Sequence, residues 1–438
     1  MNISGEHIER VLSYLNTNVE YALLRNFEGL PYNNKSRDID IIIDKREFKK
    51  HKKGIINALL NDSWKLFSYL NNGRLITYVC AKMTDGGEVE LVQWDFFINT
   101  SVHGVILLGA KEMVASREFN GSLYHVSKDY EFLDKYLYNR SVGAPYPQRY
   151  LATRSQITSS DVVKQMVKKT FGCSDINIID QMSGKSLFVK ALLQNFCLNP
   201  FSAIYNVARS WFYYIKDFIV SDVAPKIAFT GADGAGKTTV IDMIQEKIAS
   251  VYGKATEYLH FRPLLIPNIG EAAHSAGLKK EVDREYDKPH RGAKTGALSS
   301  FLRLCYYSVD YVLGYWFKVK PHAKITKVII FDRYFTDVIV DSRRSSIYLN
   351  TKFLYGWGKL FIPKMKYNIL LTADPDIILS RKQELDREGI ERINTKMEYL
   401  AAKKGYYMVM NNGTAEEAVD KILSIVIDEQ HKRNLRRV

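Results

Sequence analysis

The feature that most restricts how this chain can fold is an octapeptide near its middle, Gly231-Ala-Asp-Gly-Ala-Gly-Lys-Thr238. It matches the pattern G-x-x-x-x-G-K-[ST], after an apolar run that predicts a strand and before a run that predicts a helix. Glycines let successive N–H groups point at phosphate oxygens, and the helix start adds its positive dipole end. The sequence therefore predicts a phosphate-binding loop for ATP, formed by Gly231, Gly234, Ala235, Gly236, Lys237, Thr238 and Thr239.

The chain around this loop has the pattern of a doubly wound α/β domain with a parallel sheet. Apolar runs at 226–231, 327–334, 366–374 and 406–413 predict strands, and amphipathic helical runs separate them. The run at 327–334 ends in Asp332, which we expect beside the phosphate loop at the carboxyl ends of the strands. Thr238 and Asp332 are therefore the predicted ligands of Mg²⁺. A helix N-cap is the simpler role for an isolated Asp at this position.

Several arginines follow the predicted metal site. Arg333 has the planar fork that suits capture of an acceptor phosphate. A charged helical segment at 374–400 places Arg381 and Arg392 as candidates for a lid over the transferring phosphoryl group. For Lys382 and Arg387 in that segment, surface ion pairs are the favoured interpretation.

With these motifs, residues 226–428 resemble the thymidylate kinase family. The resemblance is carried by GADGAGKTT, FRP at 261–263, DRY at 332–334, DPDIILSR at 374–381 and MVMNNGTAEEAVDKI near the end. It implies that Lys237 and Thr238 serve ATP–Mg²⁺, that Asp233 approaches the acceptor's sugar and that Arg333 holds the acceptor phosphate. The simplest acceptor is a nucleoside monophosphate such as dTMP.

The stretch from Leu264 to Lys320 departs from that family and shows no thymine pocket. It contains PHRGAK at 289–294 and an aromatic run, and Asp337, Asp341, Arg343 and Arg344 follow the DRY motif. Such variants resemble the thymidylate-kinase-like proteins found with bacterial surface-polysaccharide genes. A sugar or glycan-linked acceptor is therefore an alternative, and a nucleotide-gated binding module without turnover is another.

Residues 1–150 predict a separate α/β domain with strands at 39–44, 74–80, 88–97 and 102–109. Asp38 and Asp40 alternate along one strand, so both carboxylates point to one face and favour a divalent cation. For the third acid we prefer Glu90, with Asp95 as the second choice. The arrangement resembles the nucleotidyltransferase superfamily, although Asn26 stands where that family has glycine. An active transferase and a degenerate, structural or sugar-binding domain both remain open.

Residues 151–225 predict a helical connector between the two domains. Within 196–220, large apolar residues recur at helical spacing from Phe201 to Ile219. This stripe is expected to pack against a neighbouring domain, or alternatively to lie on a membrane surface. The C-terminal run HKRNLRRV predicts a frayed basic end.

Composition decides among partner classes. The 438 residues carry a formal net charge of +14, and most of the excess falls in residues 226–438, where phosphates are handled. The four scattered cysteines and the absence of an apolar leader favour a reduced cytoplasmic protein. We expect a nucleotide and a phosphorylated small-molecule or glycan acceptor as partners, and no specific nucleic acid. A homodimer and a peripheral contact with the inner face of the membrane are left open.

Overall fold

A computed structural model describes residues 3–34, 38–147, 157–219, 223–252, 256–263, 265–267, 296–323 and 327–438. These residues form two compact units. Unit 1 comprises Met1–Thr84, Glu90–Ser221 and His431–Val438, and unit 2 comprises Asp85–Val89 and Asp222–Gln430. Residues 157–219, expected as a connector, fall in unit 1. The domain boundaries at 150 and 225 stay a prediction.

The core of unit 2 is a five-stranded sheet in the order β11-β12-β10-β13-β14, and every strand pair in it is parallel. The expected α/β class with a parallel sheet is confirmed. The strand preceding the phosphate loop lies at the centre because it pairs with β12 on one side and β13 on the other. The strands are β10 (Lys226–Thr230), β11 (Glu257–His260), β12 (Ile329–Asp332), β13 (Tyr367–Thr372) and β14 (Tyr406–Met410).

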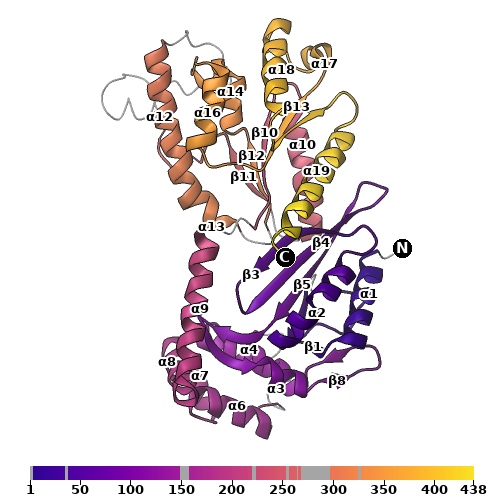
Figure 1. The fold of residues 1–438 in the computed structure, drawn as a ribbon, viewed down its shortest axis with the longest axis vertical. Helices are drawn as coiled ribbons and strands as arrows, with labels where there is room; N and C mark the ends of the chain where they lie inside the picture. The colour runs from indigo at the N-terminus through magenta and orange to yellow at the C-terminus, as the bar shows by residue number, and fades with distance from the viewer. Residues whose placement is uncertain are drawn as a thin grey trace. The chain divides into compact units, whose positions relative to one another are not determined.

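Helices cover both faces of this sheet (Figure 1). One side carries α10 (Lys237–Tyr252) and α19 (Ala415–Leu435). The other side carries α12 (Ala297–Gly314), α14 (Phe335–Val340), α16 (Thr351–Phe361) and α18 (Arg387–Ala401), whose apolar residues share one core with the sheet. Shorter elements complete the unit: η2 (Tyr315–Val319), α13 (Lys320–His322), α15 (Ser342–Ser345) and α17 (Pro375–Arg381).

Unit 1 has a mixed seven-stranded sheet in the order β3-β4-β5-β2-β1-β9-β8. The neighbours β2 and β5 run parallel, whereas β1 with β2 and β3 with β4 run antiparallel. The strands are β1 (Tyr21–Leu23), β2 (Asp38–Ile43), β3 (Lys65–Asn71), β4 (Leu75–Met83), β5 (Val89–Phe97), β8 (Glu118–Phe119) and β9 (Tyr124–His125). Strand β3 was not anticipated from the sequence.

Two apolar cores lie on the two faces of this sheet. The first packs α1 (Ile3–Asn18) and α2 (Lys45–Leu59) against the face that carries Ile39, Ile41 and Trp94. The second packs the opposite face, which carries Ile42, against helices from the later part of the unit. Those helices are α3 (Ala110–Ala115), α4 (Lys128–Val142), α6 (Asp161–Phe171), α7 (Ile176–Gln181), α8 (Gly184–Leu198) and α9 (Pro200–Ile219).

The single strand expected at 102–109 is instead a hairpin. Strand β6 (Asn99–Val102) turns at His103 and Gly104 into β7 (Val105–Gly109). Both turn residues have positive φ, 47° and 87°, which is the conformation of a two-residue hairpin loop. No described helix is long and apolar enough to cross a membrane.

Candidate functional site

The phosphate loop in unit 2 connects β10 to α10 as the sequence predicts. Gly234 and Gly236 have backbone φ angles of 91° and 87°, which residues with a Cβ rarely adopt. Lys237 is buried and turns back over the loop, where its Nζ donates to Gly231 O at 2.9 Å and Ala232 O at 2.8 Å. Burial, and then the charge of Arg333, lower the pKa of Lys237 to about 8. An anion bound next to this ammonium would raise the pKa of Lys237 back toward its ordinary value.

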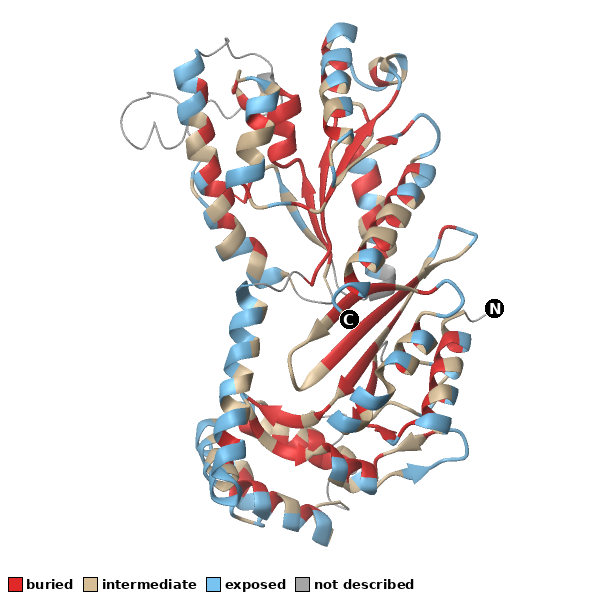
Figure 2. Ribbon diagram, in the orientation of Figure 1, coloured by how far each residue is buried: buried red, intermediate tan, exposed pale blue. Residues whose placement is uncertain are grey.

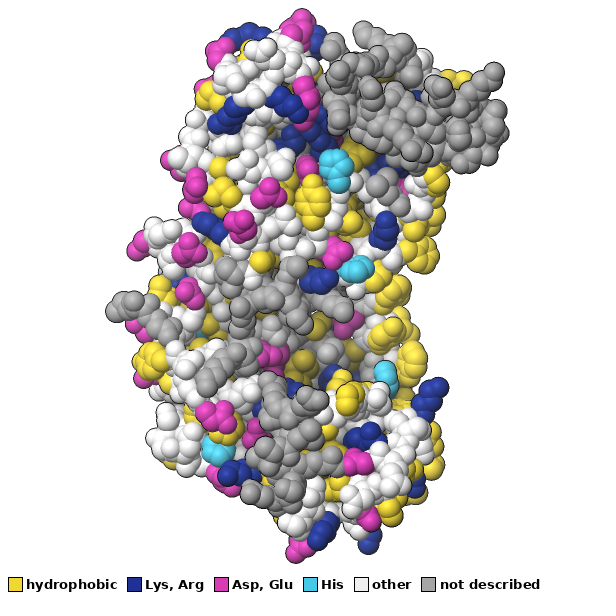
Figure 3. Space-filling model, turned by 180° about the vertical axis from the view of Figure 1, so that it is seen from behind, with side chains coloured by type: hydrophobic (Ala, Val, Ile, Leu, Met, Phe, Trp, Pro, Cys, Tyr) yellow, Lys and Arg dark blue, Asp and Glu magenta, His cyan; other side chains and the backbone are white. Residues whose placement is uncertain are grey.

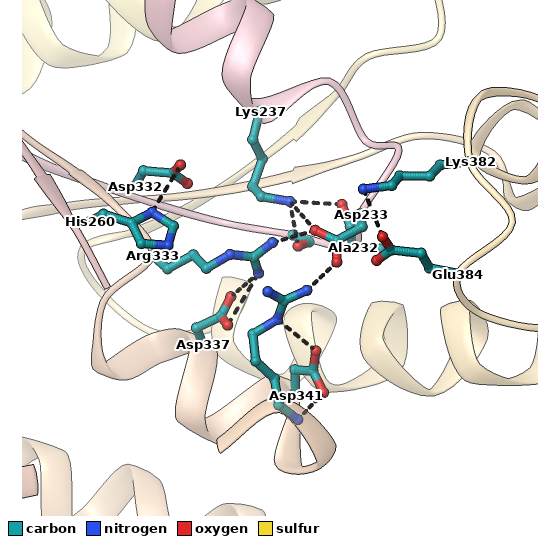
Figure 4. Close-up of polar contacts among 12 residues, drawn as sticks. Ala232, Asp233, Lys237, His260, Asp332, Arg333, Asp337, Asp341, Lys382 and Glu384 are labelled. Atoms are coloured by element: carbon teal, nitrogen blue, oxygen red, sulfur yellow. Dashed lines mark hydrogen bonds and ion pairs between the residues drawn. The ribbon is translucent and has the colours of Figure 1, made fainter. Parts of the chain in front are cut away.

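Asp233 of the loop is surrounded by three cations (Figure 4). It pairs with Arg333 and Arg344, and its Oδ1 lies 3.5 Å from Lys237 Nζ. Burial works against ionisation, but Arg333, Lys237 and Arg344 together hold the pKa of this carboxyl well below its usual range. Asp233 is thus an ionised carboxylate held by three cations. The resemblance to thymidylate kinases implied instead that it approaches the acceptor's sugar.

Arg333 is held in place by β10 and by α14, the helix that follows it. Its N–H donates to Phe229 O, and its Nη1 donates to both oxygens of Asp337, at 3.0 and 3.2 Å. The residue has a φ of 71°, a strained conformation for a side chain with a Cβ. Arg333 and Asp337 are both buried. The guanidinium is therefore preorganised beside the phosphate loop by two carboxylates.

Asp332 ends β12 next to the loop, because it pairs in register with Phe229 of β10. Its Oδ2 accepts from Tyr258 at 2.8 Å and lies 3.4 Å from His260 Nδ1. Burial opposes ionisation, but these two contacts and Arg333 hold the pKa of Asp332 below its ordinary value. Its Oδ1 is buried, and within the described part of the chain no donor reaches it. An ionised carboxylate with an unpaired buried oxygen fits a divalent cation.

The predicted threonines of the loop lie at the first turn of α10. Thr238 and Thr239 are exposed to solvent. An exposed hydroxyl one residue after the loop lysine is available to a metal or a phosphate. Together with Asp332, Thr238 therefore provides the oxygen donors that Mg²⁺ prefers.

The two candidate lid arginines lie in different places. Arg381 ends α17 beside the loop: its Nη1 donates to Asn411 O at 3.3 Å, and a Cβ on Gly236 would lie 3.8 Å from it. Arg392 is on the surface of α18, where its Nη1 bonds Glu388 at 2.8 Å. The structure thus brings Arg381, and not Arg392, to the loop. Arg392 lies on the helix surface, where Glu388, one turn earlier in α18, is its ion-pair partner.

Lys382 and Arg387, the other basic residues considered in the segment 374–400, each pair with an acid of the same segment. Lys382 Nζ lies 2.7 Å from Glu384, and Arg387 makes a bidentate contact with Asp376. Lys382 also borders the loop, since a Cβ on Gly234 would lie 3.2 Å from its Cβ.

Sequence reasoning did not assign roles to several residues of the site. Arg344 of α15, Tyr258 and His260 of β11, and Asn411 after β14 all contact the loop or its carboxylates. A signal existed for Arg344, because Asp337, Asp341 and Arg344 recur at helical spacing after the DRY motif. Tyr258 and His260 lie on β11, and only the sheet order shows that β11 is next to β12 and therefore to Asp332.

Arg262, the middle residue of the FRP motif at 261–263, pairs with an acid of α12. It is buried, and its Nη1 lies 3.2 Å from Oδ2 of the fully buried Asp310 of α12. Asp310 Oδ1 also accepts from the N–H groups of Leu265 and Ile266. The pair thus anchors the chain after β11 to α12. Residue 264 and residues 268–295, including PHRGAK at 289–294, lie outside the described part of the chain.

Unit 2 also holds a cavity of about 380 Å³ among α14, α16 and the starts of β13 and β14. Its lining includes the buried Thr336 and Asn368, which are hydrogen-bonded to each other, and the lysines Lys359, Lys364 and Lys404. The phosphate loop is not part of this lining.

In unit 1, Asp38, Asp40 and Asp95 each place a carboxylate oxygen within 4.8 Å of the others. The parallel register that pairs Asp40 with Asp95 puts all three on one face of the sheet. The preference for Glu90 was wrong: Glu90 accepts a bond of 2.6 Å from Ser4 of α1. The reason is strand periodicity, because Glu90 and Asp95 are five positions apart, an odd number that turns their side chains to opposite faces.

A cation of the protein already touches this carboxylate cluster. Arg25 Nε lies 2.8 Å from Asp40 Oδ2, and its Nη1 lies 2.7 Å from Asp134 Oδ2. Burial nonetheless raises the pKa of Asp40 to about 7, with Arg25 opposing and Asp38 adding to the shift. Burial also raises the pKa of Asp95, against hydrogen bonds from Thr77 and Gln93. Three crowded acids with one arginine are a set that a divalent cation would stabilise.

Unit 1 holds a cavity of about 250 Å³ between α9 and the turns that follow β3 and β6. Arg74 and Arg209 line it, stacked on Tyr138 and Tyr213 respectively. Asn99 also lines it, and Asn99 Oδ1 is buried with no hydrogen-bond donor within the ranges that the structure describes.

Comparison with known proteins gives similarity over less than half of the chain. The chain is 22% identical over 213 residues to the "Probable thymidylate kinase" of Pyrobaculum aerophilum, covering 46% of this chain and 95% of that protein. The crystal structure of thymidylate kinase from Ehrlichia chaffeensis matches with a TM-score of 0.33 and 15% identity, covering 46% of this chain and 98% of that one. No model of a known protein family matches. The chain is thus similar in part to thymidylate kinases.

Proposed function

We propose that unit 2 transfers a phosphoryl group from ATP, with Mg²⁺, to a phosphorylated acceptor. The observation that carries this proposal is the convergence of Lys237, Asp233, Asp332 and Arg333 on one phosphate loop (Figure 4). The partial similarity to thymidylate kinases supports the same reaction. Among acceptors, a nucleoside monophosphate such as dTMP is the simplest.

The chain's own residues would act mainly by positioning and charge. The ammonium of Lys237 exchanges the carbonyls of Gly231 and Ala232 for phosphate oxygens. Arg333 and Arg344 pair with Asp233 and would face the acceptor, and Arg381 lies beside Gly236 and would face the donor phosphates. Such fixed cations stabilise the charge of a loose phosphoryl-transfer transition state. Thr238 and Asp332 would hold Mg²⁺, which neutralises phosphate charge.

Lys237→Ala tests the phosphoryl-transfer proposal. ADP formation should fall by roughly a thousandfold or more, because the loop loses the charge that meets the donor phosphates. Lys421→Ala, at an exposed lysine of α19, is the matched control and should keep full activity. Unchanged ADP formation by Lys237→Ala, with acceptor phosphorylation followed by mass spectrometry, would contradict the proposal.

The acceptor class is tested by a panel of nucleoside monophosphates and sugar phosphates with ATP. Arg344→Met should raise the KM for the correct acceptor about tenfold or more and change the KM for ATP little, since Arg344 lies on the acceptor side. Phosphorylation of sugar phosphates alone would select the glycan-related alternative. Nucleotide binding with no phosphorylated product across the panel would select a nucleotide-gated module.

A second candidate function concerns unit 1, where Asp38, Asp40 and Asp95 gather. We propose that this cluster binds a divalent cation, as a nucleotidyltransferase-like site requires. Asp38→Asn combined with Asp40→Asn should abolish binding of Mn²⁺ to unit 1, measured by calorimetry in a Lys237→Ala, Asp332→Asn background. An unchanged titration would exclude this site. Glu90→Gln, on the opposite face, is the control that should leave the titration intact.

A further inference from the structure

The helix α9 turns its apolar side away from the rest of unit 1. Phe201 is 85% exposed and Tyr214 is 67% exposed, and the helix is coloured as exposed along most of its length in Figure 2. The other large apolar residues of α9 that are more than half exposed are Ile204, Tyr205, Trp211, Phe212, Ile215, Phe218 and Ile219. In an ordinary amphipathic helix of a soluble domain this side would face the core.

The side of α9 that contacts unit 1 carries smaller or more polar residues, together with Val207, which packs against the second core, and the ring of Tyr213. Ala203 is buried, and Asn206 and Ser210 line the cavity beside the hairpin turns. The approach is close: a Cβ on Gly104 would lie 2.4 Å from Asn206 O, and one on Gly73 would lie 2.7 Å from the Tyr213 ring. These close contacts with Gly73 and Gly104 therefore hold this side of the helix against unit 1.

The preceding helix extends the same apolar surface. Val189, Leu193, Phe196 and Leu198 of α8 are each roughly half exposed or more. With about 100 Å² exposed for each large side chain, α8 and α9 present on the order of 1000 Å² of apolar surface. The largest exposed patch of a typical monomer is about 300–600 Å². We call this area the α8–α9 surface; its α9 part is visible as hydrophobic side chains along one edge of Figure 3.

The charges around the α8–α9 surface are almost all positive. Residues 183–219 contain four cations, Lys185, Lys190, Arg209 and Lys216, and their single acid is Asp217. Arg209 and Asp217 both lie on the inner side, lining the cavity, so the lysines Lys185, Lys190 and Lys216 supply the basic rim. Trp211, Tyr205 and Tyr214 supply the amphipathic rings that favour a bilayer interface. An apolar aromatic surface with a basic rim is complementary to anionic lipid head groups.

We propose that the α8–α9 surface docks the protein onto an anionic lipid bilayer, with α9 lying in the plane of the interface. The apolar residues enter the boundary between head groups and acyl chains, and Lys185 and Lys216 contact anionic head groups. The docking is peripheral and reversible. It is independent of phosphoryl transfer in unit 2, and so can be tested in the intact chain without any acceptor.

The test is co-sedimentation of the full chain with vesicles of phosphatidylglycerol and phosphatidylcholine in equal parts, and with phosphatidylcholine alone. The chain should bind the anionic vesicles at least tenfold more tightly. Trp211→Ser with Phe218→Ser should weaken binding more than tenfold, because both side chains belong to the apolar side. Leu302→Ser with Leu360→Ser, at exposed apolar positions of unit 2, is the matched control and should bind like the parent chain.

Charge reversal separates the electrostatic part of the docking. Lys185→Glu with Lys216→Glu should weaken binding to the anionic vesicles about tenfold and leave the weak binding to phosphatidylcholine unchanged. Failure of the parent chain to bind either vesicle would overturn the proposal. So would an equal loss in the unit 2 control. A dimer that dissociates in the Trp211→Ser, Phe218→Ser variant, without vesicle binding, would show that a second copy covers the surface.

Discussion

His7 shows at the scale of a residue how burial controls ionisation in unit 1. Its ring is fully buried, stacked on Trp64 at 4.1 Å, and its Nε2 accepts from Trp94 Nε1 at 3.1 Å. Burial first, and then the charges of Arg10 and Lys82, lower its pKa to about 3. The Arg10 guanidinium lies 3.2 Å from the other ring nitrogen. The folded state therefore keeps His7 neutral from neutral pH down into mild acid.

This pKa predicts a loss of stability in mild acid. Between the ordinary histidine pKa and about 3, the unfolded chain binds a proton that the folded chain does not, so the free energy of unfolding decreases as pH falls. The expected loss from His7 between pH 7.5 and 5 is about 2 kcal/mol. His7→Gln keeps an acceptor for Trp94 and does not titrate, so its urea unfolding free energy should depend less steeply on pH. Equal slopes for the two chains would exclude His7 as the cause.

The phosphate loop shows which residues can be inferred from sequence alone. Gly234, Gly236 and Lys237 lie where the motif requires them, because the motif codes for local backbone conformation. The partners of Asp233 could not be inferred in the same way. Arg333 and Arg344 reach it from 100 and 111 residues away, and only the sheet order brings them together.

At the scale of an element, the hairpin β6–β7 sets how closely α9 can approach. Gly104 and Gly121 both have positive φ, 87° and 94°, but only Gly104 has backbone of α9 beside it. Gly104→Ala should therefore lose about 1–3 kcal/mol more in unfolding free energy than Gly121→Ala, which has only the strain of its φ, about 1–2 kcal/mol. Urea unfolding of the two variants measures the difference. Equal losses would mean that α9 can move without cost.

The elements of unit 1 also show where sequence patterns fall short. Alternation identified β2 and β5, but whether Glu90 or Asp95 joins the acid pair depends on the register between two strands. The stripe from Phe201 to Ile219 predicted a helix, and α9 is that helix. Periodicity could not tell which side of it packs, because the close contact is made by Gly73 and Gly104, far away in the chain.

At the scale of the whole molecule, unit 1 is discontinuous in the sequence. Its last part is His431–Val438, the end of α19 and the residues after it, while Ala415–Gln430 of the same helix count with unit 2. These eight residues were expected to be a frayed basic end, and that expectation was wrong. Val438 packs against the first core of unit 1, and Asn434 is buried. Their contacts are made with residues about 365 positions earlier, which no local pattern reveals.

The role of this segment follows from an irregularity in β3. The register of β3 with β4 shifts between Leu66 and Ser68. Side chains of the C-terminal segment bond to the backbone at this shift. Leu66 N–H donates to His431 Nδ1 at 2.9 Å, and Asn434 Nδ2 donates to Phe67 O at 2.8 Å and to Leu66 O at 3.3 Å. The last residues of the chain thus complete a strand of its first unit.

Removing that support should destabilise unit 1 selectively. Asn434→Ala removes the Nδ2 donor that bonds two carbonyls of β3, so the free energy of unfolding of unit 1 should fall by about 1–3 kcal/mol. The control Arg436→Ala, at an exposed position, should change that free energy by less than about 0.5 kcal/mol. A chain that ends at Gln430 should lose more than Asn434→Ala. Nucleotide binding by unit 2, followed by calorimetry with ATP, should persist in all three chains. If ATP binding fell together with the stability of unit 1, the two units would not be energetically separate. If Asn434→Ala were as stable as Arg436→Ala, the hydrogen bonds to β3 would not be what holds the segment.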